Sequence, residues 1–158
     1  MGNLTWWPNR QGIEWFQRSV LSQLPSEQFQ LHVFGLGSEG YHRSPNVFGH
    51  GFVKELSDIW SAVDCMVQPI LSGAGVNIKV AETLYNGIPM LGTIHSTRGL
   101  ALDQDEAIVL MHNEQEWVQF MRKAAFERFL TRRPSTRNRA QFSQAEATGR
   151  LKALLSDT

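Results

Sequence analysis

The stretch Ser72-Gly73-Ala74-Gly75-Val76-Asn77-Ile78-Lys79-Val80-Ala81-Glu82, closed by Asn86-Gly87-Ile88-Pro89, decides the fold of this chain. It predicts a glycine turn that leads into a short helix. The helix stops at Gly87, since glycine favours the left-handed conformation that ends helices, and Pro89 then opens a strand. A turn, a helix and a strand in this order are typical of a sheet whose parallel strands are joined by helices.

The start of this predicted helix has the chemistry of an anion site. Small residues leave its first N–H groups accessible, and the positive end of the helix dipole favours a phosphate. Lys79 and Glu82 are three residues apart, so they share one face. A lysine can hold a diphosphate, and a carboxylate can accept hydrogen bonds from sugar hydroxyls. An ordinary capped helix would also fit Lys79 and Glu82 alone, but the whole string favours a nucleotide-diphosphate site.

The rest of the chain alternates predicted helices and strands. Apolar residues at helical or alternating spacing mark each element. The expected helices span residues 9–24, 55–63 and 114–130, together with the helix of the opening stretch, whose inward side we expect to carry Ile78, Ala81 and Tyr85. The expected strands span residues 29–34, 47–48, 64–69, 89–93 and 107–111. This rhythm predicts an open parallel α/β sheet with helices on both faces, and ligands in such sheets sit beyond the carboxyl ends of the strands.

Composition excludes several classes of protein. The chain has 158 residues, and 15 lysines and arginines balance 15 aspartates and glutamates, so its charge gives no reason to expect nucleic acid. Cys65 is the single cysteine, which excludes an internal disulfide and a cysteine metal cluster. The five histidines follow no metal-binding spacing, so we expect no metal. No apolar run reaches the roughly 20 residues of a membrane span. We expect a cytoplasmic location, with peripheral attachment at the inner membrane as the alternative.

A glycine-rich segment, one histidine and three tryptophans can each be interpreted either as part of a ligand site or as an ordinary structural feature. Residues Gly35–Gly40 match the G-x-G-x-x-G fingerprint of dinucleotide sites, but the residues that follow lack helical periodicity, so a tight turn is preferred to a nicotinamide or flavin site. His95 follows a predicted strand, where ligand contact and a plain loop role are equally compatible with its position. Trp6, Trp7 and Trp15 crowd the first segment, and packing is preferred to stacking on a base or sugar.

The last segment differs from the rest. Residues 132–139 are basic and polar, and residues 140–155 have a helical pattern. A solvated connector is preferred to a site for RNA or a membrane. We therefore divide the chain into a nucleotide-sugar-binding domain, residues 1–131, and a C-terminal connector and helix, residues 132–158.

The opening stretch resembles the donor-binding half of retaining glycosyltransferases of the glycosyl transferases group 1 family, which have the GT-B architecture. The family pattern is a G-x-G turn, a lysine, an acid three residues later and a G-x-P end. Here these are Gly73-Ala74-Gly75, Lys79, Glu82 and Gly87-Ile88-Pro89. Other segments resemble family segments in the same order: residues 2–9, 34–37, 51–56, 63–69 and 97–100. The resemblance implies a Rossmann-like open parallel sheet, one half of a GT-B fold.

The resemblance also implies roles for individual residues. Lys79 and Glu82 become the catalytic pair, with Lys79 on the diphosphate and Glu82 on the ribose of the donor. The remaining donor-binding residues are Gly73, Ala74, Gly75, Val76, Asn77, Phe52, Val53 and Asn3, with Phe52 and Val53 beside the base. The implied donor is a UDP- or GDP-sugar, which is a substrate, and the implied acceptor is a sugar or glycan. No cofactor or bound metal is implied, because protein cations stabilise the leaving diphosphate.

Two departures from the family pattern stand out. Many relatives carry an acid eight residues before the second acid, where this chain has Ala74, so the choice of sugar stays open. The first loop also lacks the usual arginine and lysine, which leaves Lys79 as the main visible cation.

The resemblance further implies that the chain lacks the N-terminal acceptor half of these enzymes and the first strand of the donor half. That strand is usually central, so its loss would uncover two strand edges. We expect a fragment or a partner-dependent piece. The alternative function is a truncated domain that binds a nucleotide, or only a partner protein, without activity of its own.

Overall fold

The computed structural model describes residues 1–41 and 44–143. Most of the expected helix over residues 140–155 therefore lies outside the described residues. The described helices are α1 (Trp7–Ser19), the short 3-10 helix η1 (Leu21–Gln23), α2 (Leu56–Ala62), α3 (Ile78–Tyr85), the 3-10 helix η2 (Ile94–Thr97), α4 (Glu114–Met121), α5 (Ala124–Leu130) and α6 (Thr136–Ala140). The strands are β1 (Leu31–Phe34), β2 (Val47–Gly51), β3 (Met66–Gln68), β4 (Met90–Thr93) and β5 (Ile108–Met111).

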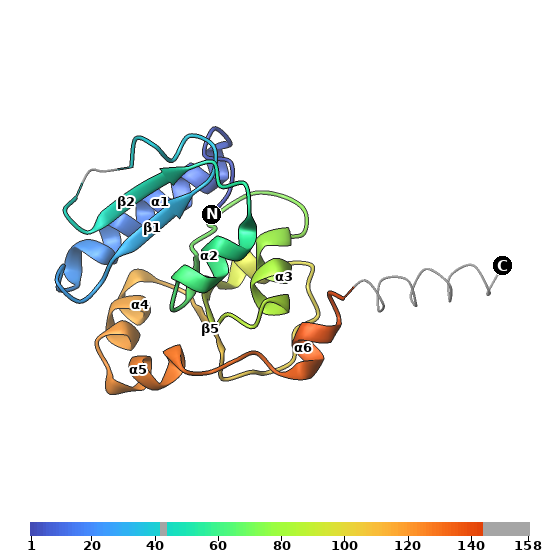
Figure 1. Cartoon of the computed structure of the whole chain (residues 1–158). Coiled ribbons are helices and arrows are strands. Elements are labelled where there is room, and N and C mark those ends of the chain that lie inside the picture. Colours follow the sequence, from blue (N-terminus) through green and yellow to red (C-terminus); the bar gives the residue numbers. More distant parts are fainter. Residues whose placement is uncertain (42–43, 144–158) are drawn as a thin grey trace.

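All strand pairs are parallel, but the strands form two separate hydrogen-bonded groups. One group is β1-β2, and the other is β3-β4-β5. Among the residues that the structure describes, strand β1 pairs only with β2, and β3 pairs only with β4. In Figure 1 the β1-β2 pair lies with α1, apart from the group that contains β5. The sheet of this α/β fold is therefore divided between β1 and β3.

The side chains of both groups fit one layered arrangement. Neighbouring residues of a strand point to opposite faces. Val33 and Leu91 belong to the largest core cluster, with residues of α1, α4 and α5. Phe34 packs in a second cluster with Ile59 of α2, and Met90 in a third with residues of α3. Helices thus cover both faces, and the expected Rossmann-like α/β class is confirmed.

Helix α1 lies close to the loop that follows β3. Pro8 sits in its first turn, where proline needs no N–H partner. Phe16 and Val20 are buried one turn apart and fix its inward side. Gly12 faces the loop, since a Cβ at this position would lie 2.1 Å from the carbonyl oxygen of Pro69. Only a residue without a side chain allows this contact.

Two sequence predictions about helices are wrong. The expected single helix over residues 114–130 is broken into α4 and α5, because Lys123 adopts an extended conformation and caps α5. The predicted inward side of α3 is also wrong. Ile78 and Tyr85 are 68% and 52% exposed, whereas Val80, Thr83 and Leu84 are buried. The short helix turns the face with Val80 and Leu84 toward Met90, and this packing decides which residues are buried.

The Gly35–Gly40 segment forms turns, as expected. Gly35 and Gly37 have φ values of +117° and +84°, and no helix begins between residues 35 and 41. A dinucleotide fingerprint needs a helix at this place.

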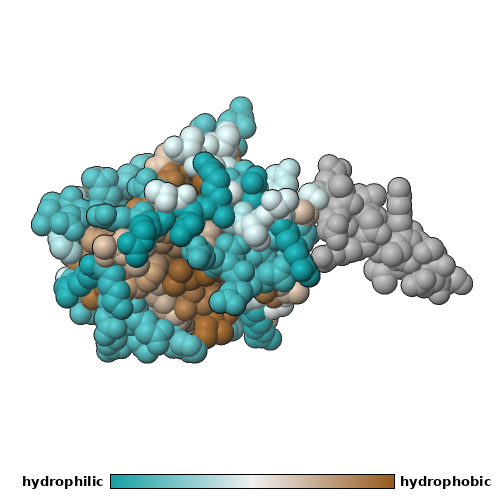
Figure 2. Space-filling model, turned by 90° about the horizontal axis from the view of Figure 1, so that it is seen from below, coloured by the Kyte–Doolittle hydropathy of each residue, from teal (hydrophilic) through white to brown (hydrophobic). Residues whose placement is uncertain are grey.

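The surface has one apolar area in the view from below, enclosed by hydrophilic residues (Figure 2). Among the described residues, no helix is long and apolar enough to cross a membrane.

Candidate functional site

Two loops meet beyond the carboxyl ends of β1 and β3. The N-terminal loop, residues 2–6, runs along the end of β1, where the Gly2 N–H donates to the Phe34 carbonyl at 2.8 Å. The glycine loop, residues 69–77, follows β3. The rings of Trp6 and Pro8 lie against Gly73, so that a Cβ there would be 3.4 Å from Trp6 Cη2. This is the edge where a parallel sheet of this class binds ligands.

Side-chain hydrogen bonds hold the glycine loop in place, while its two glycines are exposed. Thr93 Oγ1 donates to the Ile70 carbonyl, and Ser72 Oγ donates to Gln11 Oε1 at 2.9 Å. Gly73 and Gly75 have φ values of +118° and +88°, which favour glycine. Both are exposed. At Gly75 the backbone is open, since a Cβ there would meet nothing within 4 Å, so this part of the loop can contact a ligand directly.

His95 of η2 also holds this loop. Its Nε2 lies 3.1 Å from the Gly73 carbonyl oxygen. A carbonyl only accepts, so Nε2 carries the proton in this contact. The structure therefore places His95 beside the predicted site, in contact with its backbone.

The first turn of α3 faces the junction of the two loops. Asn77 caps the helix, and its Oδ1 accepts the Lys79 N–H at 3.2 Å. Asn77 Nδ2 donates to Gln68 Oε1 at 3.3 Å, so the cap is fixed by a buried side chain of β3. A fixed cap holds the direction of the helix start, where an anion is favoured.

Lys79 is the predicted site residue whose position the fold defines most clearly. Its stem crosses Gly2, where a Cβ would lie 3.3 Å from Lys79 Cδ. Burial lowers the pKa of Lys79, and the carboxylate of Glu82 opposes this effect. Glu82 is partly buried on the same helix, and neither residue belongs to an ion pair in the part of the chain that the structure describes. The lysine is therefore a partly desolvated cation with capacity for an added anion.

The other predicted residues lie on the segment after β2, on the glycine loop and on the N-terminal loop. Phe52, directly after β2, is 75% exposed, while Val53 packs with the cluster that contains Phe34. Ala74 and Val76 are exposed on the glycine loop. Asn3 lies next to Gly2, but its Oδ1 accepts from the Thr5 N–H and hydroxyl at 2.9 and 2.7 Å. Its side chain is thus already used within its own loop.

A family model described as glycosyl transferases group 1 matches residues 1–125. This range contains both loops, α3 and the segment after β2. The chain belongs to this family. No curated protein matches the chain. The match identifies this glycosyltransferase family domain as a Rossmann-like half of a GT-B fold. It also supports the prediction that the protein is a transferase. Because the match ends at residue 125, the domain boundary at residue 131 stays a prediction.

Two buried side-chain amides of this glycosyltransferase domain were not predicted from the sequence. Gln68 is the last residue of β3, in a stretch predicted as an apolar strand, and it is buried; among the described residues its Nε2 has no partner. Asn9 of α1 donates to the Asn3 carbonyl at 2.8 Å, while its buried Oδ1 has no partner. A polar residue within the apolar run Met66-Val67-Gln68 was the available signal for the first. Nothing in the local pattern distinguished Asn9.

Within residues 1–41 and 44–143, no group of three histidine, cysteine, aspartate or glutamate side chains is placed to hold a metal ion.

Proposed function

We propose that this domain binds a nucleotide-diphosphate sugar and transfers the sugar to an acceptor. The observation that carries the proposal is the position of Lys79. Its partly buried stem lies against Gly2 of the N-terminal loop, and the residue stands in the first turn of the helix that follows the glycine loop. A cation, free backbone and a helix N-terminus at one point suit a diphosphate.

The remaining roles are those that the family resemblance implies. Lys79 and the N–H groups between Gly75 and Asn77 bind the phosphates, and Glu82 accepts hydrogen bonds from the ribose. Phe52 and Val53 lie beside the base. The sugar then lies toward Ala74 and the acceptor. When the bond from the sugar to the diphosphate breaks, negative charge grows on the phosphate oxygen, and Lys79 stabilises this charge in the transition state. The donor is a UDP- or GDP-sugar, and the acceptor is a sugar or glycan.

Calorimetric titration with UDP, GDP, ADP and NADH tests this proposal. We expect one nucleoside diphosphate to bind with a Kd below about 1 mM, which corresponds to roughly 4 kcal/mol, and NADH to bind no better than that limit. Glu82→Gln should weaken binding of the preferred nucleotide. It should leave binding of the 2′,3′-dideoxy form almost unchanged, because that form lacks the ribose hydroxyls that Glu82 would bind. Absence of binding by every diphosphate would contradict the proposal. Release of the diphosphate from a sugar nucleotide with added acceptors separates transfer from binding alone.

The pH dependence of binding gives a separate prediction. Burial lowers the pKa of Lys79 below its usual 10.5, so its positive charge is lost as the pH rises through this lowered value. Affinity for the diphosphate should therefore begin to fall at a pH below 10.5, while Lys79→Arg, which keeps its charge throughout this range, should show a smaller fall. Both proteins bind the same nucleotide, so comparing their slopes of affinity against pH removes the contribution of the nucleotide base. Equal slopes would mean that Lys79 does not contact the phosphates.

A further inference from the structure

Two histidines meet on the β1-β2 pair of strands. His32 of β1 and His50 of β2 lie with Nδ1 and Nε2 only 2.8 Å apart. Their rings are nearly parallel, at 14°, and the ring centroids are 5.1 Å apart. Because the two nitrogens are much closer than the centroids, the rings meet at their edges. Neither residue belongs to the proposed donor site, so the proposed function gives this pair no role.

A bulge in β2 brings His50 to this place. Val33 of β1 is opposite Gly49, but the next residue of β1, Phe34, is opposite Gly51. His50 is therefore the extra residue of the bulge. A bulge redirects the side chain of a strand, and bulges are over-represented next to functional sites. The backbone itself thus sets the direction of this histidine.

Phenylalanine rings support both imidazoles. Phe34 is stacked on His50 with the ring centroids 4.5 Å apart, and Phe48 is stacked on His32 with the centroids 5.1 Å apart. Phe34 is buried and His32 is partly buried, whereas His50 is exposed. The pair is therefore held by the sheet on one side and is accessible to solvent at His50.

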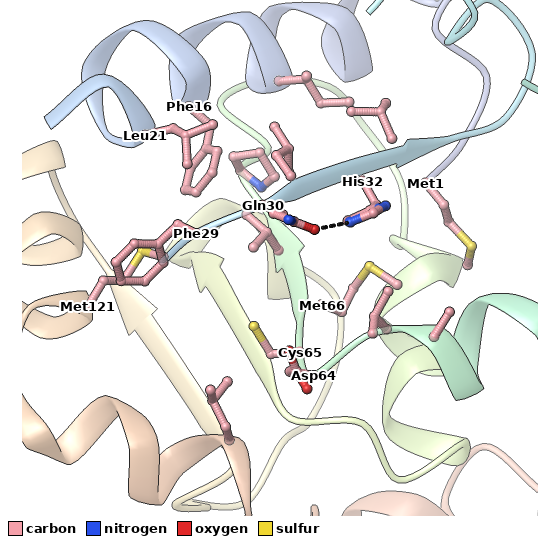
Figure 3. A pocket seen from close by; sticks show the side chains of 18 of the residues that line it. Met1, Phe16, Leu21, Phe29, Gln30, His32, Asp64, Cys65, Met66 and Met121 are labelled. Atoms are coloured by element: carbon pink, nitrogen blue, oxygen red, sulfur yellow. Dashed lines mark hydrogen bonds between the residues drawn. The ribbon is translucent and has the colours of Figure 1, made fainter. Parts of the chain in front are cut away.

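Gln30 fixes the tautomer of His32. Its Oε1 lies 3.3 Å from His32 Nε2, and Figure 3 shows this bond at the edge of a cavity that both residues line. An amide oxygen only accepts, so Nε2 carries the proton and Nδ1 keeps its lone pair toward His50. A histidine that binds a metal usually donates its other N–H to an oxygen atom, which orients the ring and makes the free nitrogen a better ligand. His32 therefore already has the hydrogen bonding of a metal ligand.

The spacing of the two nitrogens fits a square-planar metal ion. Two nitrogens about 2.0 Å from one ion and at a right angle are about 2.8 Å apart, whereas in a tetrahedral zinc site they are about 3.3 Å apart. Square-planar sites with nitrogen ligands are typical of Cu²⁺ and Ni²⁺. The ion lies beside the line that joins the nitrogens, so the rings must turn toward it. The exposed ring of His50 has the freedom to do so.

We propose that His32 Nδ1 and His50 Nε2 form a binding site for one Cu²⁺ or Ni²⁺ ion. The ion replaces the hydrogen bond between the rings, and the proton of His50 Nε2 moves to Nδ1 of the same ring. Among the described residues, no third histidine, cysteine, aspartate or glutamate is placed to complete a group of three, so the other positions are open to water or a small ligand. The bound ion links β1 to β2. The proposal does not depend on a nucleotide.

Calorimetric titration of the untagged full chain with Cu²⁺, Ni²⁺, Zn²⁺ and Mg²⁺ tests this site. We expect one equivalent of Cu²⁺ or Ni²⁺ to bind more tightly than Zn²⁺, and Mg²⁺ not to bind. His32→Ala and His50→Ala should each weaken Cu²⁺ binding at least about tenfold. The control is His112→Ala, which removes an exposed histidine after β5 and should leave the affinity unchanged. Ni²⁺ at about one hundred times its Kd should raise Tm by roughly 5–10 °C.

Electron paramagnetic resonance of the bound Cu²⁺ gives a readout that needs no variant. The spectrum of the unchanged chain should show coupling to two imidazole nitrogens. Coupling to a single nitrogen would overturn the proposal, as would tighter binding of Zn²⁺ than of Cu²⁺. Equal affinity of the His50→Ala and His112→Ala proteins for Cu²⁺ would also contradict it, and so would the absence of any saturable binding of Cu²⁺ and Ni²⁺ below about 1 mM.

Discussion

Lys79→Ala is expected to weaken binding of the preferred nucleoside diphosphate about 10- to 100-fold. A hydrogen bond to a charged group contributes roughly 1.5–3 kcal/mol, and each 1.4 kcal/mol is a factor of ten in Kd. The loss should be close to the upper end, because the Lys79 stem lies over Gly2 and its amine is held at the site at little entropic cost. Calorimetry at constant pH measures the change directly.

The matched control is Lys123→Ala. Lys123 is exposed between α4 and α5, far along the chain from both loops of the site. This variant should bind the nucleotide as the unchanged chain does. Lys79→Arg should recover part of the affinity, since it restores the charge with a different geometry. If Lys79→Ala bound as tightly as Lys123→Ala, the diphosphate would have to lie elsewhere.

Gly12→Ala should destabilise the domain by about 2–3 kcal/mol and lower Tm by roughly 5–10 °C. Helix propensity predicts the opposite, because alanine is favoured over glycine within a helix by about 1 kcal/mol. The close contact of α1 with the β3 loop decides whether the substitution stabilises or destabilises the domain. The added methyl would lie 2.1 Å from the Pro69 carbonyl oxygen, which is backbone and cannot rotate away. Thermal and urea unfolding measure the effect.

Gly40→Ala is the control for this substitution. A Cβ at Gly40 meets nothing within 4 Å, so stability should change little. Gly12→Ala should also weaken nucleotide binding, because the displaced Pro69 begins the glycine loop. A Gly12→Ala protein as stable as the Gly40→Ala protein would show that α1 can move away from β3 without cost.

Much of the fold could be predicted because its signals are local. The glycine turn, the N-cap at Asn77 and the stop at Gly87 define α3 within one stretch of sequence. The break between α4 and α5 could not be predicted in this way. Residues on both sides keep a helical apolar pattern, and the extended conformation of Lys123 follows from the packing of Phe126 and Phe129 in the core.

The candidate site shows the same division. The spacing of Lys79 and Glu82 was enough to predict that they share one helix. The contact of Lys79 with Gly2 could not, because it joins residues far apart in sequence. The prediction of which side of α3 faces inward was wrong for a related reason. Ile78 is as apolar as Val80, and only the position of Met90 decides which of them is buried.

Gly2 connects the end of β1 with the proposed donor site. Its N–H donates to the Phe34 carbonyl, and the Lys79 stem lies against its Cα. A nucleotide that fixes Lys79 should therefore also order Gly2 and the end of β1. Linkage requires reciprocity: a change that orders the end of β1 would raise nucleotide affinity by the same factor as the nucleotide stabilises that end of the strand. A single glycine would thus make order at the end of β1 and occupancy of the donor site cooperative.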